Sequence, residues 1–264
     1  MPSTVSKDGT RIAYESKGSG PALILVDGAC CYRAMGPARP LAELLTRQFT
    51  VFTYDRRGRG ESGDTAPWAM EREVEDLAAI VHQAGGSACV YGISSGAALA
   101  ADAAKRIPGI RKLILYEAPF IVDNSNTPMP ADFVSKLRGL VEADQRGEAL
   151  KMFLRRVGVP AFGLFIMQFL PAWKKLKSVA HTLPYDLTIV QNYSHCKPLP
   201  AQQWADVSIP VLVADGGKSP LWMQRGMEAW AEIFPNAKHL RIAGQTHMLK
   251  PQAIAPVMRE FFAN

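Results

Sequence analysis

The sequence predicts an α/β protein with a mostly parallel central sheet, helices on both faces of the sheet, and one helical insertion. Two observations support this. Short apolar runs alternate with segments of helical periodicity in the first part of the chain and again near its end. Between these regions, helical patterns follow one another without a convincing strand. We expect a core formed by residues 1–118 and 208–264, with residues 119–207 inserted into it as a helical cap.

The expected strands are short apolar runs that end at turn residues. The first two flank Asp8-Gly9, a dipeptide that favours a hairpin turn. In chain order the strands lie around residue 5 and at residues 11–16, 22–26, 50–54, 88–91, 112–116, 210–214 and 238–242.

The helices expected between these strands carry apolar residues on one face. Residues 70–82 show this pattern most clearly, since four apolar side chains share one side of the predicted helix: Val74, Leu77, Ala78 and Val81. The pair Gly85-Gly86 ends that helix. The other core helices are expected at residues 41–47, 95–105, 223–233 and from the last strand to residue 262.

The insertion contains four helical segments separated by prolines. They are expected at residues 131–142, 147–157, 162–170 and 173–181, with the dividing prolines at positions 160, 171 and 184. An insertion between two strands of one sheet lies over the strand ends, where open α/β sheets bind ligands. We therefore expect these helices to form a lid over a binding site.

Composition and charge exclude several classes of partner. The chain is 48% hydrophobic and 20% charged, a balance typical of globular proteins. Its net charge of +6 comes from scattered basic residues, and the two basic clusters, at residues 55–59 and 173–177, lack the interleaved aromatics of a nucleic-acid surface. The amino terminus has no signal-peptide core, and the apolar stretch 161–170 is too short to span a bilayer. We expect a cytoplasmic protein without nucleic-acid or membrane partners.

The cysteines show neither a metal-binding nor a disulfide pattern. Two of the four are adjacent and none belongs to a C-x-x-C pair: Cys30, Cys31, Cys89 and Cys196. A P-loop and a dinucleotide-binding fingerprint are also missing from the sequence. We expect reduced cysteines, no metal, no cofactor, and a small molecule as the partner.

The motif that indicates chemistry is Gly92-Ile-Ser-Ser-Gly96, which fits G-x-S-x-G. It follows a predicted buried strand and opens a predicted helix, the context that a nucleophile elbow requires. Glycine at both ends relieves the clashes that this strained turn imposes. Ser94 is therefore the predicted nucleophile and Ser95 the second choice. A turn of small residues without chemical significance is the alternative interpretation.

With this motif, the chain resembles the α/β-hydrolase family from about residue 9 to residue 263. Three further segments support the resemblance: Leu25-Val-Asp-Gly-Ala-Cys30, Tyr54-Asp-Arg-Arg-Gly-Arg-Gly-Glu-Ser62 and Gly244-Gln-Thr-His247. The resemblance implies an α/β-hydrolase fold. It is less specific for the substrate, because one fold hosts many reactions.

A serine hydroxyl needs a base to take its proton during attack. Of the five histidines, only His247 follows the last predicted strand, in a loop that can return to the serine. His247 is therefore the predicted general base. His181 lies in the insertion and is a candidate for substrate contact, although a packed or surface histidine is the simpler interpretation.

The resemblance also implies an oxyanion hole formed by the backbone N–H groups of Ala29 and Ser95. Asp27 stands where the family usually has a histidine, so it either hydrogen-bonds the adjacent loop or places a carboxylate near the hole. The residues after it, including Cys30 and Tyr32, are expected to line the entrance. Together with His181, these are the predicted pocket residues.

The acid of the triad departs from the commonest family pattern. The resemblance implies an acid on the loop after the seventh strand, but Ser219 stands at that position. Other branches carry the acid after the sixth strand, where this chain has Glu117. We rank Glu117 first, Asp215 second and Asp123 last. The alternative for Glu117 is a hinge residue that only binds backbone.

These features predict a serine hydrolase that cleaves a small, moderately apolar ester or lactone through an acyl-enzyme on Ser94. The insertion is rich in large apolar side chains, which suit such a substrate but would equally pack a lid onto the core: Phe162, Phe165, Met167, Phe169 and Trp173. One alternative is a carbon–carbon bond hydrolase or lyase that uses the same triad. Another is a low-turnover, receptor-like binding protein, which a triad without an acid would favour.

Overall fold

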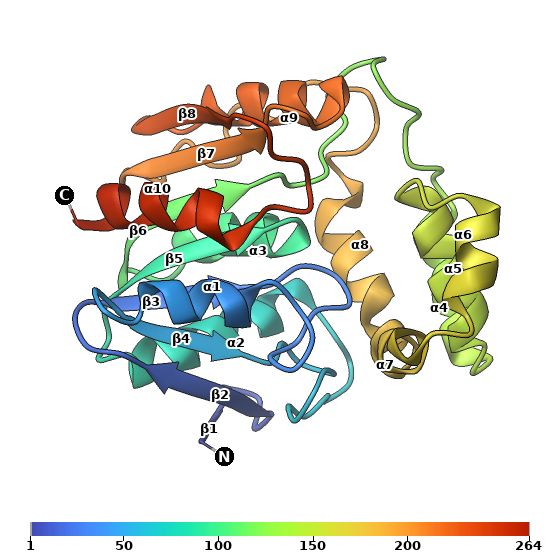
Figure 1. Ribbon diagram of the computed structural model, residues 1–264, viewed down its shortest axis with the longest axis horizontal. Coiled ribbons are helices and arrows are strands. Elements are labelled where there is room, and N and C mark those ends of the chain that lie inside the picture. Colours follow the sequence, from blue (N-terminus) through green and yellow to red (C-terminus); the bar gives the residue numbers. More distant parts are fainter. Residues whose placement is uncertain (1, 264) are drawn as a thin grey trace.

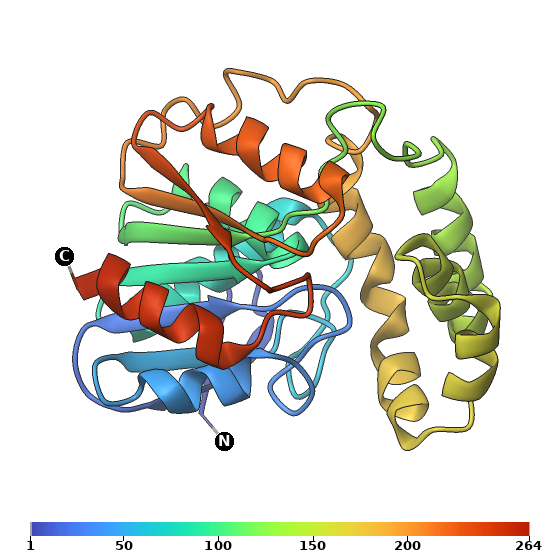
Figure 2. The same cartoon turned by 45° about the horizontal axis from the view of Figure 1, so that its top comes forward.

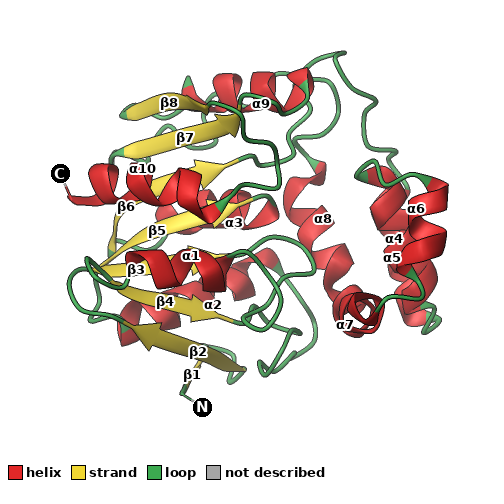
Figure 3. Ribbon diagram, viewed as in Figure 1, coloured by secondary structure: helices red, strands yellow, loops and turns green. Residues whose placement is uncertain are grey.

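The computed structural model describes residues 2–263, which contain an eight-stranded sheet in the order β1-β2-β4-β3-β5-β6-β7-β8 (Figures 1 and 3). The strands are β1 (Ser3–Val5), β2 (Arg11–Lys17), β3 (Ala22–Val26), β4 (Thr50–Tyr54), β5 (Ala88–Ile93), β6 (Ile110–Tyr116), β7 (Val211–Gly216) and β8 (Ala237–Ile242). β2 pairs antiparallel with both β1 and β4, and all other neighbours are parallel. The predicted α/β class with a mostly parallel sheet is confirmed.

Helices cover both faces of the sheet. One face packs against α1 (Ala38–Leu45) and α10 (Pro251–Ala263), and the other against α2 (Met70–Gln83), α3 (Ser95–Ala104) and α9 (Leu221–Ala231). Successive side chains of a strand point to opposite faces, so the central strand β3 serves both layers. Its Leu23 and Leu25 pack into the α1 and α10 layer, whereas Ile24 and Val26 pack into the other.

The chain between β6 and β7 forms a group of helices beyond the carboxyl ends of the parallel strands (Figures 1 and 2). They are α4 (Phe133–Glu142), α5 (Arg146–Arg156), α6 (Ala161–Met167), α7 (Pro171–Val179), the 3₁₀ helix Ala180–Thr182 and α8 (Leu183–Gln191). In both views α8 lies between the strand ends and the other helices of this group. The edge formed by the carboxyl ends of the strands, where open α/β sheets bind ligands, therefore faces α8.

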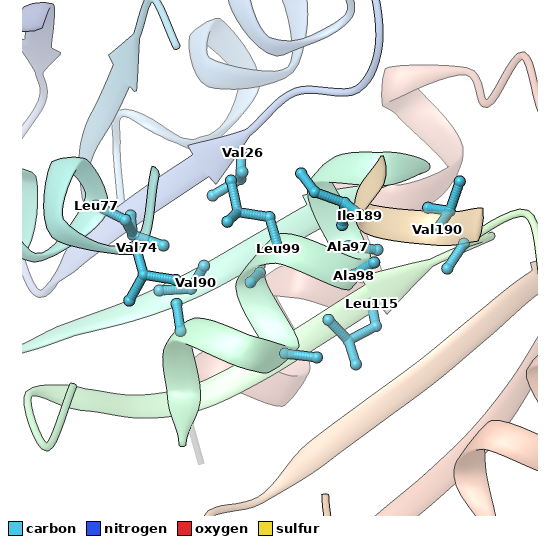
Figure 4. Packing of buried hydrophobic residues seen from close by; sticks show 14 of the residues in the cluster. Val26, Val74, Leu77, Val90, Ala97, Ala98, Leu99, Leu115, Ile189 and Val190 are labelled. Carbon is cyan, nitrogen blue, oxygen red and sulfur yellow. The ribbon is translucent and has the colours of Figure 1, made fainter. Parts of the chain in front are cut away.

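Helix α8 was missed by the sequence prediction, which took Pro184 as a break and placed no further helix in the insertion after residue 181. Pro184 lies in the first turn of α8, where a helix leaves the backbone N–H unbonded in any case, so proline is tolerated there. Its residues Ile189 and Val190 are buried and lie beside Ala97 of α3 (Figure 4). Helix α8 thus packs the insertion directly onto the helix that follows β5.

Candidate active site

Ser94 lies in a strained turn between β5 and α3. Its backbone has φ 59° and ψ −131°, a conformation rare for a residue with a side chain. A Cβ on Gly96 would lie 2.4 Å from the Val26 carbonyl oxygen, and one on Gly92 would lie 2.6 Å from that of Gly96. Only glycine fits at either position. The glycine spacing of the motif is therefore explained by close backbone packing around Ser94.

Glycine is also required in the turn after β3, which faces the elbow. A Cβ on Gly28 would lie 2.8 Å from the Ser94 Cβ and 3.4 Å from its Oγ. The turn after β3 therefore passes directly beside the serine. It brings Ala29, the next residue, to the same cavity as Ser94.

Glu117 and His247 contact each other although 130 positions separate them in the chain. The Glu117 Oε2 lies 2.9 Å from the His247 Nδ1. The carboxylate is fully buried, and its Oε1 accepts hydrogen bonds from the Gly216 N–H at 2.7 Å and the Ser219 hydroxyl at 2.5 Å. Since a carboxylate only accepts, Nδ1 is the donor and Nε2 keeps a lone pair. This arrangement fixes both the orientation and the tautomer of the imidazole.

The other two candidate acids have different partners. Asp215 binds the His239 Nε2 at 2.6 Å and the Arg241 Nε at 2.7 Å. Burial acts to raise the pKa of Asp215, but the hydrogen bonds from His239 and Arg241 outweigh burial and hold the pKa below its usual value. Asp123 pairs with the Arg225 Nη1 at 2.8 Å and with Ser125. The geometry therefore favours Glu117 as the partner of His247.

A cavity of about 360 Å³ lies where the strand ends meet the inserted helices. The core contributes Ala29, Ser94, Ser95 and His247 to its lining, and the insertion contributes residues that include Met129, Phe153, Arg156, Asp186, Leu187 and Val190. Its volume falls within the range of roughly 300–1,000 Å³ found for small-molecule sites. The nucleophile, base and oxyanion-hole residues predicted from the sequence thus share one cavity.

The four predicted pocket residues lie outside this lining. Asp27 is buried in its own loop, where a Cβ on Gly36 would lie 2.7 Å from the Asp27 Oδ2. Burial raises the pKa of Asp27 to about 7, against the lowering effect of the guanidinium groups of Arg59 and Arg56. This agrees with the loop-binding interpretation rather than with a carboxylate at the hole.

The other three residues have local partners. Cys30 is buried, and burial raises the pKa of its thiol to about 12. The backbone of Tyr32 pairs with that of Met35. The His181 Nδ1 lies 3.2 Å from the Arg146 Nη1. Cys30 and Tyr32 were suggested by their place after the β3 turn and His181 by its place in the insertion, but none of the three lines the cavity that holds Ser94.

Sequence reasoning missed a buried ion cluster next to Ser94. Asp186 of α8 accepts hydrogen bonds from the Arg56 Nη1 at 2.8 Å, the Arg59 Nη2 at 2.6 Å and the Ser95 Oγ at 2.7 Å. Asp186 is 1% exposed, so these contacts are shielded from water. Burial acts to raise its pKa, but the two arginines and Ser95 hold it below the usual value.

The same cluster contacts the turn after β3. The Arg59 Nη1 donates to the Gly28 carbonyl oxygen at 2.7 Å, and that carbonyl belongs to the same peptide unit as the Ala29 N–H. Asp186 and Arg59 therefore bind both segments from which the oxyanion hole is expected. The arginine-rich loop 55–59 was the signal in the sequence, but its partner Asp186 lies 127 positions away from Arg59.

Other charged residues of this loop connect segments of the core. Asp55 accepts hydrogen bonds from the Arg33 N–H at 2.7 Å and the Glu61 N–H at 2.9 Å. Arg57 pairs with Asp76 at 2.7 Å and with Asp8 at 3.0 Å. Among residues 2–263, histidine, cysteine and acidic side chains form no group of three or more that could hold a metal ion. Within the same residues, every helix is too short or too polar to cross a membrane.

Comparisons with known proteins agree with this architecture. Residues 23–257 match the model of the alpha/beta hydrolase family. An alpha/beta hydrolase from Sphaerobacter thermophilus superposes with a TM-score of 0.90 at 46% identity, covering 99% of this chain and 100% of that chain.

Two similar proteins have named activities. A pimeloyl-[acyl-carrier protein] methyl ester esterase from Xanthomonas oryzae is 28% identical over 245 residues, which cover 87% of this chain and 89% of that protein. An enol-lactonase from Burkholderia xenovorans superposes with a TM-score of 0.74 at 16% identity and covers both chains fully, a likeness of fold alone.

Proposed function

The chain belongs to the alpha/beta hydrolase family and is a hydrolase, and from this premise we propose that it cleaves a small, moderately apolar ester or lactone. The observation that carries the proposal is the 2.9 Å contact between Glu117 and His247 at a cavity that also holds Ser94. The named methyl ester esterase among the similar proteins supports an acyl substrate.

The chemistry follows from the roles that these groups can take. The Ser94 Oγ attacks the carbonyl carbon while its proton passes to the His247 Nε2, and Glu117 stabilises the resulting imidazolium. The N–H groups of Ala29 and Ser95 stabilise the negative oxygen of the tetrahedral intermediate. The leaving alcohol takes the proton from His247, and an acyl-enzyme remains on Ser94. Water then attacks by the same route and releases the acid.

We include residues 119–207 in the proposal as a cap. Their helices contribute much of the apolar lining of the cavity, so they would hold the non-reacting part of the substrate. Placing substrate under helices also excludes water from the reacting groups. A cytoplasmic location remains part of the proposal, and the four free cysteines suit it.

The two alternatives differ from this proposal in measurable ways. A carbon–carbon hydrolase or lyase would use the same residues, so products from diketone, cyanohydrin and ester panels distinguish it. A receptor-like protein would be favoured by a triad without an acid. The contact of Glu117 with His247 removes that support.

The first test is labelling with a fluorophosphonate, which modifies activated serines. We expect the label on Ser94, and we expect Ser94→Ala to abolish both labelling and ester hydrolysis. The matched control is Ser95→Ala, which keeps the backbone N–H and loses only the hydrogen bond to Asp186. Loss of this one bond should reduce turnover by about tenfold, far less than loss of the nucleophile. Labelling of Ser95 in the mapped peptide, or full activity of Ser94→Ala, would refute the assignment.

A further inference from the structure

The cavity contains one cation without a carboxylate partner among the described residues. Three side chains of its lining can carry charge: His247, Asp186 and Arg156. His247 is held by Glu117, and Asp186 is neutralised by Arg56 and Arg59. Arg156 alone is left to interact with what enters the cavity.

Arg156 is the last residue of α5, and its guanidinium is bound by a backbone carbonyl rather than by a carboxylate. Its Nη2 donates to the Thr127 carbonyl oxygen at 2.9 Å, and no ion pair joins it to a carboxylate within residues 2–263. Burial lowers the pKa of Arg156, and Cys196 provides the one opposing effect. The guanidinium has five donors, so a single carbonyl leaves most of them free.

Three further polar side chains that line the cavity, Ser194, Ser95 and Asn126, already have partners within the protein. The Ser194 hydroxyl contacts the carbonyl oxygens of Val190 and Pro119, and the Ser95 hydroxyl binds Asp186. The Asn126 side chain accepts a hydrogen bond from the Thr127 N–H at 2.8 Å. An anion entering the cavity would therefore find its matching charge at Arg156.

We propose that Arg156 forms a carboxylate-binding subsite, so that the substrate is an ester or lactone that also carries a carboxylate group. The inference rests on the proposed acyl chemistry at Ser94 and specifies the substrate of that site. A planar guanidinium binds a carboxylate through two parallel hydrogen bonds. A single arginine balances one negative charge, which suits a carboxylate better than a phosphate monoester with nearly two. The net charge of +6 favours the approach of such an anion.

The test compares two esters of matched shape. Monomethyl adipate carries a carboxylate at the end of its chain, and methyl 6-methylheptanoate has a neutral isopropyl group in its place. Monomethyl esters from succinate to suberate cover the spacing between ester and carboxylate. We expect the best anionic ester to have a kcat/KM about tenfold to a hundredfold above its neutral partner, because hydrogen bonds to charged groups contribute that much. The difference should lie in KM, since the subsite is remote from the reacting bond.

Arg156→Gln removes the charge but keeps a donor for the Thr127 carbonyl. It should abolish the preference for the anionic ester and leave the neutral ester within about twofold, whereas Arg156→Lys should restore part of the preference. The matched control is Arg155→Gln, which removes an exposed charge one residue away that does not line the cavity. An equal loss in both glutamine variants, or an unchanged preference in Arg156→Gln, overturns the subsite.

Binding to the Ser94→Ala variant separates the subsite from the proposed reaction. Calorimetry with monomethyl adipate should give a Kd at least about tenfold lower in Ser94→Ala than in the same variant carrying Arg156→Gln. If this difference is found while the wild type hydrolyses neither ester, the subsite stands and the proposed reaction fails. If the wild type hydrolyses both esters equally and the two Kd values agree, the reaction stands and the subsite is refuted.

Discussion

Glu117 is held by the residues around position 219, where the family pattern implied the acid. Ser219 stands where the family pattern implied the acid, and its hydroxyl now donates to the Glu117 Oε1 at 2.5 Å. The Gly216 N–H donates to the same oxygen, so the carboxylate is held from two sides while Oε2 binds His247. Ser219 therefore supports Glu117, the carboxylate that we propose as the acid of the triad.

We expect Glu117→Gln to lower kcat by about 10⁴-fold, the loss seen when a triad acid becomes an amide and the imidazole tautomer is no longer fixed. The control is Asp215→Asn, which removes a carboxylate bound to His239 and Arg241 rather than to His247. Asp215→Asn should keep kcat within a few-fold of the wild-type value. Steady-state kinetics of both variants on one ester test the ranking, and a larger loss in Asp215→Asn would reverse it.

A rescue distinguishes a lost acid from general damage. The Ser219 Oγ already contacts Glu117, so an aspartate at 219 would place a carboxylate in the same region. Adding Ser219→Asp to Glu117→Gln should therefore recover part of the lost kcat. The same substitution in the wild type should destabilise the protein, because two carboxylates would then share one buried site.

Asp27 predicts a pH dependence of stability. The pKa of Asp27 is about 7 in the folded protein, whereas an unperturbed aspartate, as in the unfolded chain, has a pKa of 3.8. Between these two pH values the native protein therefore binds a proton that the unfolded chain has released. Raising the pH through this window therefore favours unfolding, by up to about 1.4 kcal/mol for each pH unit. Asp27→Asn should gain stability over the wild type from pH 4 to pH 7 and keep a constant advantage above it.

Urea unfolding at pH 5 and pH 8 measures this effect, and Asp8→Asn is its control. The pKa of Asp8 is lowered to about 2, because the hydrogen bonds from Thr10 and Arg57 outweigh the effect of burial. Asp8 is therefore ionised in both states above about pH 5, and its substitution should shift stability equally at the two pH values. An advantage of Asp27→Asn that is the same at pH 5 and pH 8 would contradict the raised pKa.

At the scale of the elements, α8 joins the insertion to the proposed site. Its Asp186 binds Ser95 on one side of the elbow, and Arg59 on the other side binds the Gly28 carbonyl. Asp186→Asn should lower kcat by about 10²-fold, comparable to the loss of an oxyanion donor, because it loosens both segments. Breaking a buried ion pair from one side should also cost about 3–5 kcal/mol of stability.

The control for Asp186→Asn is Glu73→Gln. Glu73 also pairs with Arg56, at 2.7 Å, but none of its hydrogen bonds reaches Ser95 or Gly28. Glu73→Gln should destabilise the protein to a similar extent, while its kcat, measured on the folded fraction, stays within a few-fold of the wild-type value. Equal losses of kcat in the two variants would mean that Asp186 has only a structural role.

The elements also show what a sequence can and cannot predict here. The strands were found because buried parallel strands are continuous apolar runs. Glu117 was ranked first because the resemblance implied that some branches of the family carry the acid after the sixth strand. Helix α8 was missed because Pro184 was taken as a break rather than as a first-turn residue. The contact between Asp186 and Ser95 joins residues 91 positions apart, and periodicity within one segment carries no information on such pairs.

At the scale of the whole molecule, an aromatic cluster joins the insertion to the core. Phe120 and Tyr193 lie near the two ends of the insertion, with their ring centroids 4.8 Å apart. Trp204 lies 5.1 Å from Tyr193 and 5.3 Å from Trp230 of α9, and its indole N–H donates to Asp102 of α3. Both connections of the insertion are therefore packed against core helices.

We therefore expect the insertion and the core to unfold together in one transition. Denaturant curves from tryptophan fluorescence, which reports on five tryptophans including Trp204 and Trp230 of the cluster, and from far-UV circular dichroism, which reports on all helices, should coincide. Trp204→Ala should lower the free energy of unfolding by about 3–5 kcal/mol, the usual cost of removing a buried aromatic side chain. Phe162→Ala is the matched control: that side chain is 75% exposed on α6, so its loss should change stability by no more than about 0.5 kcal/mol. An early transition seen by circular dichroism alone would show that the inserted helices unfold independently of the sheet.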